Sequence, residues 1–299
     1  MKAAKWIREL PLHLLLLPGL ALVLIYSYVP MLGVVIAFQK FTIFSGWFGS
    51  PWVGLDNFKY VLDLPDTGRV IWNTLFIASM KIVAGLIVPI VIAILLNEVS
   101  RAFVKRSVQT LIYLPHFLSW VILSGILIDL LSPSEGLVNA FLAWISIEPI
   151  FFLADNRWFP AVLIVSDVWK EFGFSTIVYL AAITSVNPTL YEAAVMDGAN
   201  RWRQTLHITL PGMMPIIVLM ATLSLGNVLN AGFDQVFNLA NPLVYESGDI
   251  LDTMIYRIAF NDAQYGLATA VGLFKSVVSF LLISISYLLA YRFANYRIF

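Results

Sequence analysis

Six long apolar runs constrain this chain more than any other feature of its sequence. They lie at about 13–38, 70–96, 108–131, 161–184, 213–232 and 266–291. A helix needs about 20 mostly apolar residues to cross the hydrocarbon core of a bilayer. Of the 299 residues, 60% are hydrophobic and only 12% are charged, whereas soluble domains carry roughly 25% charged residues. The sequence therefore predicts an all-α, polytopic membrane protein, with six transmembrane helices in a single domain over residues 1–299.

The first apolar run follows a basic stretch and superficially resembles a signal peptide. It is longer than the apolar region of such a peptide, and no small-x-small cleavage site follows it. We therefore expect it to be retained as a membrane anchor.

The lysines and arginines of the connections predict the orientation, because cytoplasmic loops are enriched in them. Ten lie on the side that includes both termini, and five lie in the longer loops of the other side. We therefore expect both termini in the cytoplasm. The first set is Lys2, Lys5, Arg8, Arg101, Lys105, Arg106, Arg201, Arg203, Arg292 and Arg297, and the second is Lys40, Lys59, Arg69, Arg157 and Arg257.

The polar composition excludes several kinds of site. There is no cysteine, and the three histidines are far apart in the sequence without a zinc-ligand spacing. The formal net charge is zero, which indicates no nucleic-acid partner. We expect no catalytic residue and no metal site.

The segment 44–62, before the second run, contains two tryptophans and ends in an amphipathic stretch. Tryptophan favours the headgroup level of a bilayer, which favours an interfacial helix. An ordinary structured loop is an equal alternative.

The connection 185–212 is predicted to form two short helices joined at Gly198. Asn187 can cap the first helix, and Pro188 suits its first position. The second helix has an apolar face and is expected to stop at Pro211. A helix of about ten residues is marginal alone in water, so the first helix either docks into a partner's groove or packs on its own subunit.

This connection resembles the EAA loop of binding-protein-dependent ABC transporter permeases. The matching pattern is Glu192-Ala193-Ala194, three residues, Gly198, nine residues, and Ile208-x-Leu210-Pro211, on the predicted cytoplasmic loop before the fifth run. Further stretches resemble the sugar (maltose-type) branch and, within it, the LplB-like permeases for complex oligosaccharides. These stretches are WVGLDNFKYVL (52–62), NTL (73–75), LPHFLSW (114–120), VWKEFGFSTIVYLAAI (168–183) and FDQVFNL (233–239).

The resemblance implies a type I ABC importer permease fold in the bacterial inner membrane. The loop 185–212 would then be a coupling helix that lies in a cleft of a cytoplasmic ATPase dimer, where ATP and Mg²⁺ bind. The other implied partners are a second permease, homologous but not identical, an extracytoplasmic solute-binding protein and a carbohydrate. The implied coupling residues are Glu192, Ala193, Ala194, Asp197, Gly198 and Arg201.

The chain has no nucleotide site of its own in sequence. The stretch GLFKS at 272–276 lacks the adjacent Gly-Lys pair and the preceding glycine of a phosphate-binding loop. ATP and Mg²⁺ are therefore expected only on partner subunits.

Lys81, Lys170 and Lys275 fall within apolar runs, with Asp167 and Glu171 beside Lys170. A lysine at mid-depth costs roughly 2.5–3.5 kcal/mol on insertion scales, so each needs a protein interior or a watery cavity. One interpretation is a polar substrate path; the other is ion pairing or snorkelling that serves structure alone. If the lysines line the path, an anionic glycan is a plausible cargo.

The resemblance to maltose-type permeases places sugar contacts on the span that precedes the coupling loop. The fifth run adds polar residues at helical spacing, which either contact substrate or join helices. The candidate path residues are Trp169, Lys170, Glu171, Phe174, Ser224, Asn227, Asn230, Lys81 and Lys275.

Three other functions compete with this one. An ion-driven secondary transporter would leave the EAA loop without a role. A membrane enzyme would need a carboxylate or histidine cluster that the sequence lacks, and a scaffold would not need charges within its spans.

Overall fold

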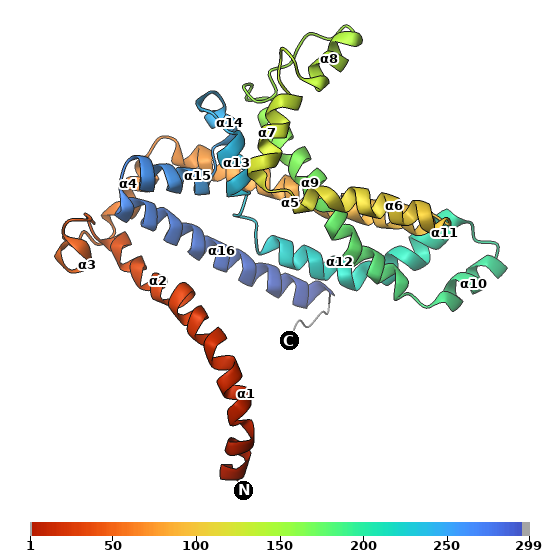
Figure 1. Ribbon diagram of the computed structural model, residues 1–299, viewed down its shortest axis with the longest axis horizontal. Helices are drawn as coiled ribbons and strands as arrows, with labels where there is room; N and C mark the ends of the chain where they lie inside the picture. The colour runs from red at the N-terminus through yellow and green to blue at the C-terminus, as the bar shows by residue number, and fades with distance from the viewer. Residues whose placement is uncertain (1, 295–299) are drawn as a thin grey trace. The chain divides into compact units, whose positions relative to one another are not determined.

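The computed structural model describes the backbone of residues 2–294 (Figure 1). Within that range the chain forms helices and connecting loops, with one isolated antiparallel bridge between Gln39 and Trp52 and no strand. The all-α prediction is confirmed. Arg297, which was counted for the orientation, lies outside the described residues.

The chain divides into two compact units. One comprises residues 1–65 and 255–274, and the other comprises residues 66–254 and 275–299. The long C-terminal helix α16 (Tyr265–Ala294) contributes its start to the first unit and the rest to the second.

The first unit begins with a nearly continuous apolar helix. It joins α1 (Lys2–Val23), η1 (Leu24–Tyr28), α2 (Val29–Met31) and η2 (Leu32–Phe38), and its stretch Glu9–Phe38 is long and apolar enough to span a membrane. The π-helical η1 ends two residues before Pro30. A proline cannot donate the backbone hydrogen bond of a regular helix, so a wider turn at this place is expected.

The first unit also contains short helices, and contacts to backbone carbonyl groups hold parts of it together. These helices are α3 (Gly46–Gly49), α4 (Asp56–Asp63) and η6 (Arg257–Asn261). Asn57 of α4 donates from Nδ2 to the carbonyl oxygens of Ala37 and Gln39, at 2.8 and 3.0 Å. A side chain at Gly266 would lie 2.5 Å from the Gln39 carbonyl oxygen. The helix expected in 44–62 thus forms as α4; its interfacial position stays a prediction.

The second unit is built on two long helices that pack side by side, α5 (Thr67–Glu98) and α9 (Phe159–Thr184). Apolar residues gather at both ends of this pair. One cluster includes Ile77, Leu123, Phe159 and Leu163, and the other includes Ala93, Tyr179, Ile183 and Met213. Burial of these side chains holds α7, α12 and α13 against the α5–α9 pair.

The predicted span 108–131 is divided in two. The segment formed by α6 (Ala102–Tyr113) and η3 (Leu114–Phe117) meets α7 (Trp120–Leu130) at an angle of 104° (Figure 1). Pro115 lies in η3, where it cannot continue a regular helix, and the Ser119 hydroxyl caps α7 by accepting from the Ile122 amide at 3.4 Å. The sequence pattern predicted the apolar length but not this bend.

Short helices complete the second unit. They are α8 (Leu137–Trp144), α10 (Pro188–Met196), α11 (Arg201–Gln204), η4 (Thr205–Thr209), α12 (Leu210–Leu225), α13 (Phe233–Leu239), η5 (Pro242–Val244), α14 (Tyr245–Gly248) and α15 (Leu251–Tyr256), the last of which runs into the first unit.

Four helical stretches of the described chain are long and apolar enough to span a membrane, and the bent α6–α7 pair makes a fifth. The predicted span 161–184 forms helix α9, which is more charged than these stretches. Every 18-residue stretch of α9 contains Asp167, Lys170 and Glu171. Length and composition alone therefore support five spans, and the sixth depends on how α9 satisfies its charges.

Candidate functional site: the coupling loop and the charged face of α9

The first helix of the loop 185–212 forms as expected. Asn187 caps α10 by accepting from the Thr189 amide at 3.1 Å, and Pro188 is its first residue. The helix ends at Asp197, and Gly198 has a φ of +75°, which allows the chain to turn. Local sequence therefore determines the bounds of α10.

No residue of α10 is buried. Large apolar side chains are exposed at Leu190, Val195 and Met196, and the predicted coupling residues Glu192 and Ala193 are exposed as well. Ala194 is half-buried, whereas Asp197 and Gly198 are exposed. Within this chain α10 lacks the cover that usually stabilises a helix of its length.

A groove of about 860 Å³ lies beside α10 in the second unit. It is lined by residues of α10, of α11 and η4, and of the ends of α5 and α9. Tyr191 and Thr209 join α10 to η4 by a hydroxyl–hydroxyl hydrogen bond of 2.9 Å. Arg201 lies 3.5 Å from the Glu98 carboxylate at the end of α5, which ties the loop to a long helix.

The second half of the loop differs from the prediction. It does not stop at Pro211: α11, η4 and α12 form one apolar stretch, Arg201–Leu225. The π-helical η4 ends two residues before Pro211, and a wider turn accommodates a residue that cannot donate its backbone hydrogen bond. The loop 185–212 therefore continues directly into the fifth apolar run.

Lys81 lies in a closed polar cluster between α5, α9 and the segment before α13. Its Nζ donates to the Ala231 carbonyl oxygen at 2.7 Å and to Gln235 Oε1, and it lies 3.3 Å from Asp167 Oδ1. Gln235 donates in turn to the Leu163 carbonyl oxygen and to Ser166 Oγ, both at 2.8 Å. The Lys81 side chain is 8% exposed. This geometry matches the interpretation in which Lys81 forms an ion pair that serves structure alone.

Lys170 and Glu171 lie in a second cluster, about one helical turn further along α9. Lys170 Nζ donates to Glu171 Oε1 at 2.7 Å and to the His116 carbonyl oxygen at 3.1 Å. His116 Nδ1 donates to Glu171 Oε2 at 2.7 Å, because a carboxylate only accepts. The His116 ring stacks on Phe174 with centroids 4.3 Å apart. His116 was not predicted as a site residue, since it lies 55 residues away from Glu171 in sequence.

Gly173 makes the approach of the end of α6 to α9 possible. A Cβ atom at this position would lie 1.9 Å from the Ile112 carbonyl oxygen. Without one, the end of α6 lies directly on α9 and carries His116 to Glu171. A conspicuous glycine between charged and aromatic residues was the one available signal in the sequence.

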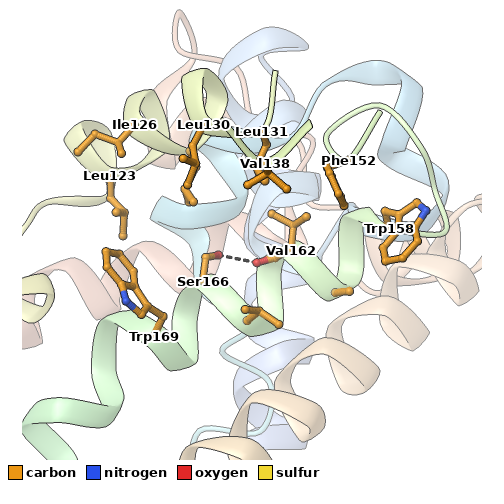
Figure 2. A pocket seen from close by; sticks show the side chains of 13 residues that line it. Leu123, Ile126, Leu130, Leu131, Val138, Phe152, Trp158, Val162, Ser166 and Trp169 are labelled. Carbon is orange, nitrogen blue, oxygen red and sulfur yellow. Dashed lines mark hydrogen bonds between the residues drawn. The ribbon is translucent and has the colours of Figure 1, made fainter. Parts of the chain in front are cut away.

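Trp169 belongs to a different face of α9. Figure 2 shows its ring beside Leu123 at one end of an apolar cavity of about 430 Å³ between α7, α8 and α9. Two residues along a helix are about 200° apart, so Trp169 and Glu171 point in nearly opposite directions. The stretch 169–174 is therefore not one continuous binding surface.

The remaining candidates lie apart from these clusters. α12 ends at Leu225, and Asn227 and Asn230 lie in the turns that follow, so the helical spacing assumed for them and Ser224 does not apply. Lys275 Nζ bonds to Asp252 Oδ1 at 2.5 Å, and both side chains are 19% exposed. Among the described residues, no group of three or more acidic or histidine side chains could hold a metal ion.

The family follows from a sequence match. Residues 81–295 match the family described as "Binding-protein-dependent transport system inner membrane component". This chain belongs to that family. The match begins at Lys81 and includes the loop 185–212 and both charged clusters of α9.

Two similar proteins come from Bacillus subtilis (strain 168). Protein LplB is 42% identical over 95% of this chain and 87% of its own length. The "polygalacturonan/rhamnogalacturonan transport system permease protein YteP" is 43% identical over 99% of this chain and 92% of its own length.

A solved structure has the same fold. A chain of a bacterial ABC transporter "involved in the import of the acidic polysaccharide alginate" matches with a TM-score of 0.90, at 39% identity, over 97% of this chain and 98% of that chain. The same kind of transporter has been solved with an "alginate pentasaccharide-bound periplasmic protein", with a TM-score of 0.89, 38% identity and coverage of 97% and 96%. The expected ABC importer permease fold is confirmed.

Proposed function

We propose that this chain is the membrane-spanning permease subunit of an ATP-driven importer for acidic oligosaccharides. The observation that carries the proposal is α10, an exposed helix with the EAA pattern, on a chain of the binding-protein-dependent family. The names of YteP and of the alginate transporter support the cargo, because galacturonan and alginate chains both carry carboxylates.

The proposed partners follow the type I importer arrangement. A second, non-identical permease completes the translocation path, and a periplasmic binding protein delivers the oligosaccharide. An ATPase dimer binds ATP and Mg²⁺ in the cytoplasm, and this chain performs no catalysis. Both termini and the loop 185–212 lie on the cytoplasmic side of the inner membrane, as the distribution of lysine and arginine indicates.

Coupling occurs through α10. Its exposed apolar residues enter a cleft of the ATPase, and Glu192 pairs with a basic side chain there. When ATP closes the ATPase dimer, α10 moves with it, and the continuous stretch Arg201–Leu225 carries the motion into the membrane. Lys170, Glu171 and Phe174 lie beside the path and contact the cargo.

The experiment is uptake into proteoliposomes that contain both permeases, the ATPase and the binding protein. We expect uptake of a trigalacturonate only with ATP inside the liposomes, and no change when ionophores abolish ion gradients. Uptake driven by an ion gradient without ATP would instead establish a secondary transporter.

A further inference from the structure

The cluster around Glu171 contains two hydrogen-bond donors that converge on one carboxylate. Lys170 Nζ and His116 Nδ1 both lie 2.7 Å from it, each on a different oxygen. Two donors that each bond one oxygen of a carboxylate form a binding geometry. Any other carboxylate that can enter the same position can accept the same two hydrogen bonds. Here the carboxylate belongs to the protein itself.

The donors are held more firmly than the acceptor. The side chains of Lys170 and His116 are 9% and 28% exposed, whereas that of Glu171 is 41% exposed. Lys170 keeps a second hydrogen bond, to the His116 carbonyl oxygen, and lies 5.7 Å from the centre of the Trp120 ring. His116 is held by its parallel stacking on Phe174. Rotation of Glu171 away would leave both donors in place.

The charges make this arrangement unusual for the proposed cargo. A fixed carboxylate on the path of an acidic oligosaccharide would repel it, by a Coulomb energy of about 1–4 kcal/mol at 4 Å near a protein surface. The repulsion is reduced if the carboxylate of the cargo takes the place of Glu171 between the two donors, because both donors keep an anionic partner and the displaced Glu171 is screened by water.

We propose that Lys170 and His116 together bind carboxylate groups of the cargo in the transport path. Glu171 is then an internal counter-ion that a uronate group of the cargo displaces. When no cargo is bound, Glu171 neutralises the buried lysine. When a uronate arrives, Glu171 rotates into the more aqueous path. The uronate is then held by two preformed bonds. Neutral sugars do not compete for this position, so the pair discriminates by charge.

The first experiment tests the anion site without any sugar. Thermal unfolding of the full-length Glu171→Ala chain in detergent micelles is followed in sodium acetate and in sodium chloride of equal ionic strength. We expect the substitution to lower the unfolding midpoint and acetate, but not chloride, to restore at least half of the loss. The control is Glu246→Ala, an exposed glutamate whose Oε2 accepts a hydrogen bond from Asn156 Nδ2 at 3.4 Å. Equal responses to the two salts would overturn the proposal.

The second experiment tests displacement in the assembled transporter, and it rests on the proposed function. Binding of trigalacturonate and of its trimethyl ester is measured by calorimetry on the wild type and on Glu171→Gln. We expect the preference for the acid over the ester to rise about tenfold in Glu171→Gln, since the neutral amide competes less well for Lys170. Glu171→Asp, which keeps the charge but shortens the reach, should give a smaller rise.

An unchanged or reduced preference for the acid would overturn the displacement. If the wild type binds neither probe while acetate still restores Glu171→Ala, the proposed cargo is wrong and the anion site stands. The two proposals therefore fail in different ways.

Discussion

Two charged clusters lie about one turn apart on α9, and they differ in how completely their charges are enclosed. Around Lys81, a carboxylate, an amide and a carbonyl group surround a lysine side chain that is 8% exposed, and the Asp167 carboxylate is 25% exposed. Around Lys170, the lysine is as deeply buried, but its partner Glu171 is 41% exposed. The comparison teaches that two equally buried lysines of one span can differ in the exposure of their counter-ions, and the proposed recognition of cargo depends on that difference.

The largest effect is expected at the closed cluster. Lys81→Met leaves the largely buried carboxylate of Asp167, 25% exposed, without its cation, which should destabilise the chain by about 3 kcal/mol. The double variant Lys81→Met with Asp167→Asn removes both charges and should recover most of the loss. Thermal unfolding of the purified chain measures both. If the double variant is as unstable as the single one, hydrogen bonding of Lys81 to Ala231 and Gln235 matters more than its charge.

The next effect concerns the approach of His116 to α9. Gly173→Ala places a methyl group against the Ile112 carbonyl oxygen and should destabilise the chain by about 1–3 kcal/mol. It should also remove the acetate response of the Glu171→Ala background, because His116 is displaced.

The control for this substitution is Gly125→Ala in α7, where an added Cβ atom meets nothing within 4 Å. This variant should retain wild-type stability. Equal stability of the two alanine variants would show that α6 does not lie against α9 at Gly173.

The pair between Lys275 and Asp252 is an intermediate case. It is a single bond of 2.5 Å with equal exposure of both partners. Asp252→Asn should cost about 1–2 kcal/mol, less than the loss at Lys81, because the lysine keeps some access to water. Unfolding midpoints of this variant and of Lys81→Met compare the two directly. A larger loss of stability in Asp252→Asn than in Lys81→Met would contradict the expectation that the destabilisation increases with the burial of the ion pair.

The smallest effect on stability is expected where the charge is exposed. Glu192→Ala on α10 should change the free energy of unfolding by less than about 0.5 kcal/mol. The same variant should lower ATP-dependent uptake about tenfold or more, since it removes a partner contact and no internal one. Uptake and unfolding are measured on one preparation. Loss of stability together with uptake would mean that α10 packs on its own subunit.

Part of the fold was accessible from short-range patterns. Asn187, Pro188 and Gly198 predict the bounds of α10 because capping and turning depend on a few neighbouring residues. The prediction of a stop at Pro211 was wrong, because a π-helical turn preserves the continuity of the helix.

The candidate site was only half predictable. Lys170 and Glu171 can be selected from the sequence because they are charges in an apolar run. Nothing in the sequence pairs them with His116. That residue reaches α9 because the chain bends after η3 and because the end of α6 contacts Gly173. Trp169, adjacent to them in sequence, faces an apolar cavity instead.

The sequence by itself determined the apolar helices, their membrane environment and the bounds of α10. Each depends on composition or on residues a few positions apart, and a bilayer stabilises apolar helices of sufficient length. Only the tertiary structure decided that Lys81 is enclosed by its partners, whereas Lys170 pairs with the half-exposed carboxylate of Glu171. That difference arises from packing between segments far apart in the chain, where a glycine, a proline bend and a stacked ring determine what reaches each charge.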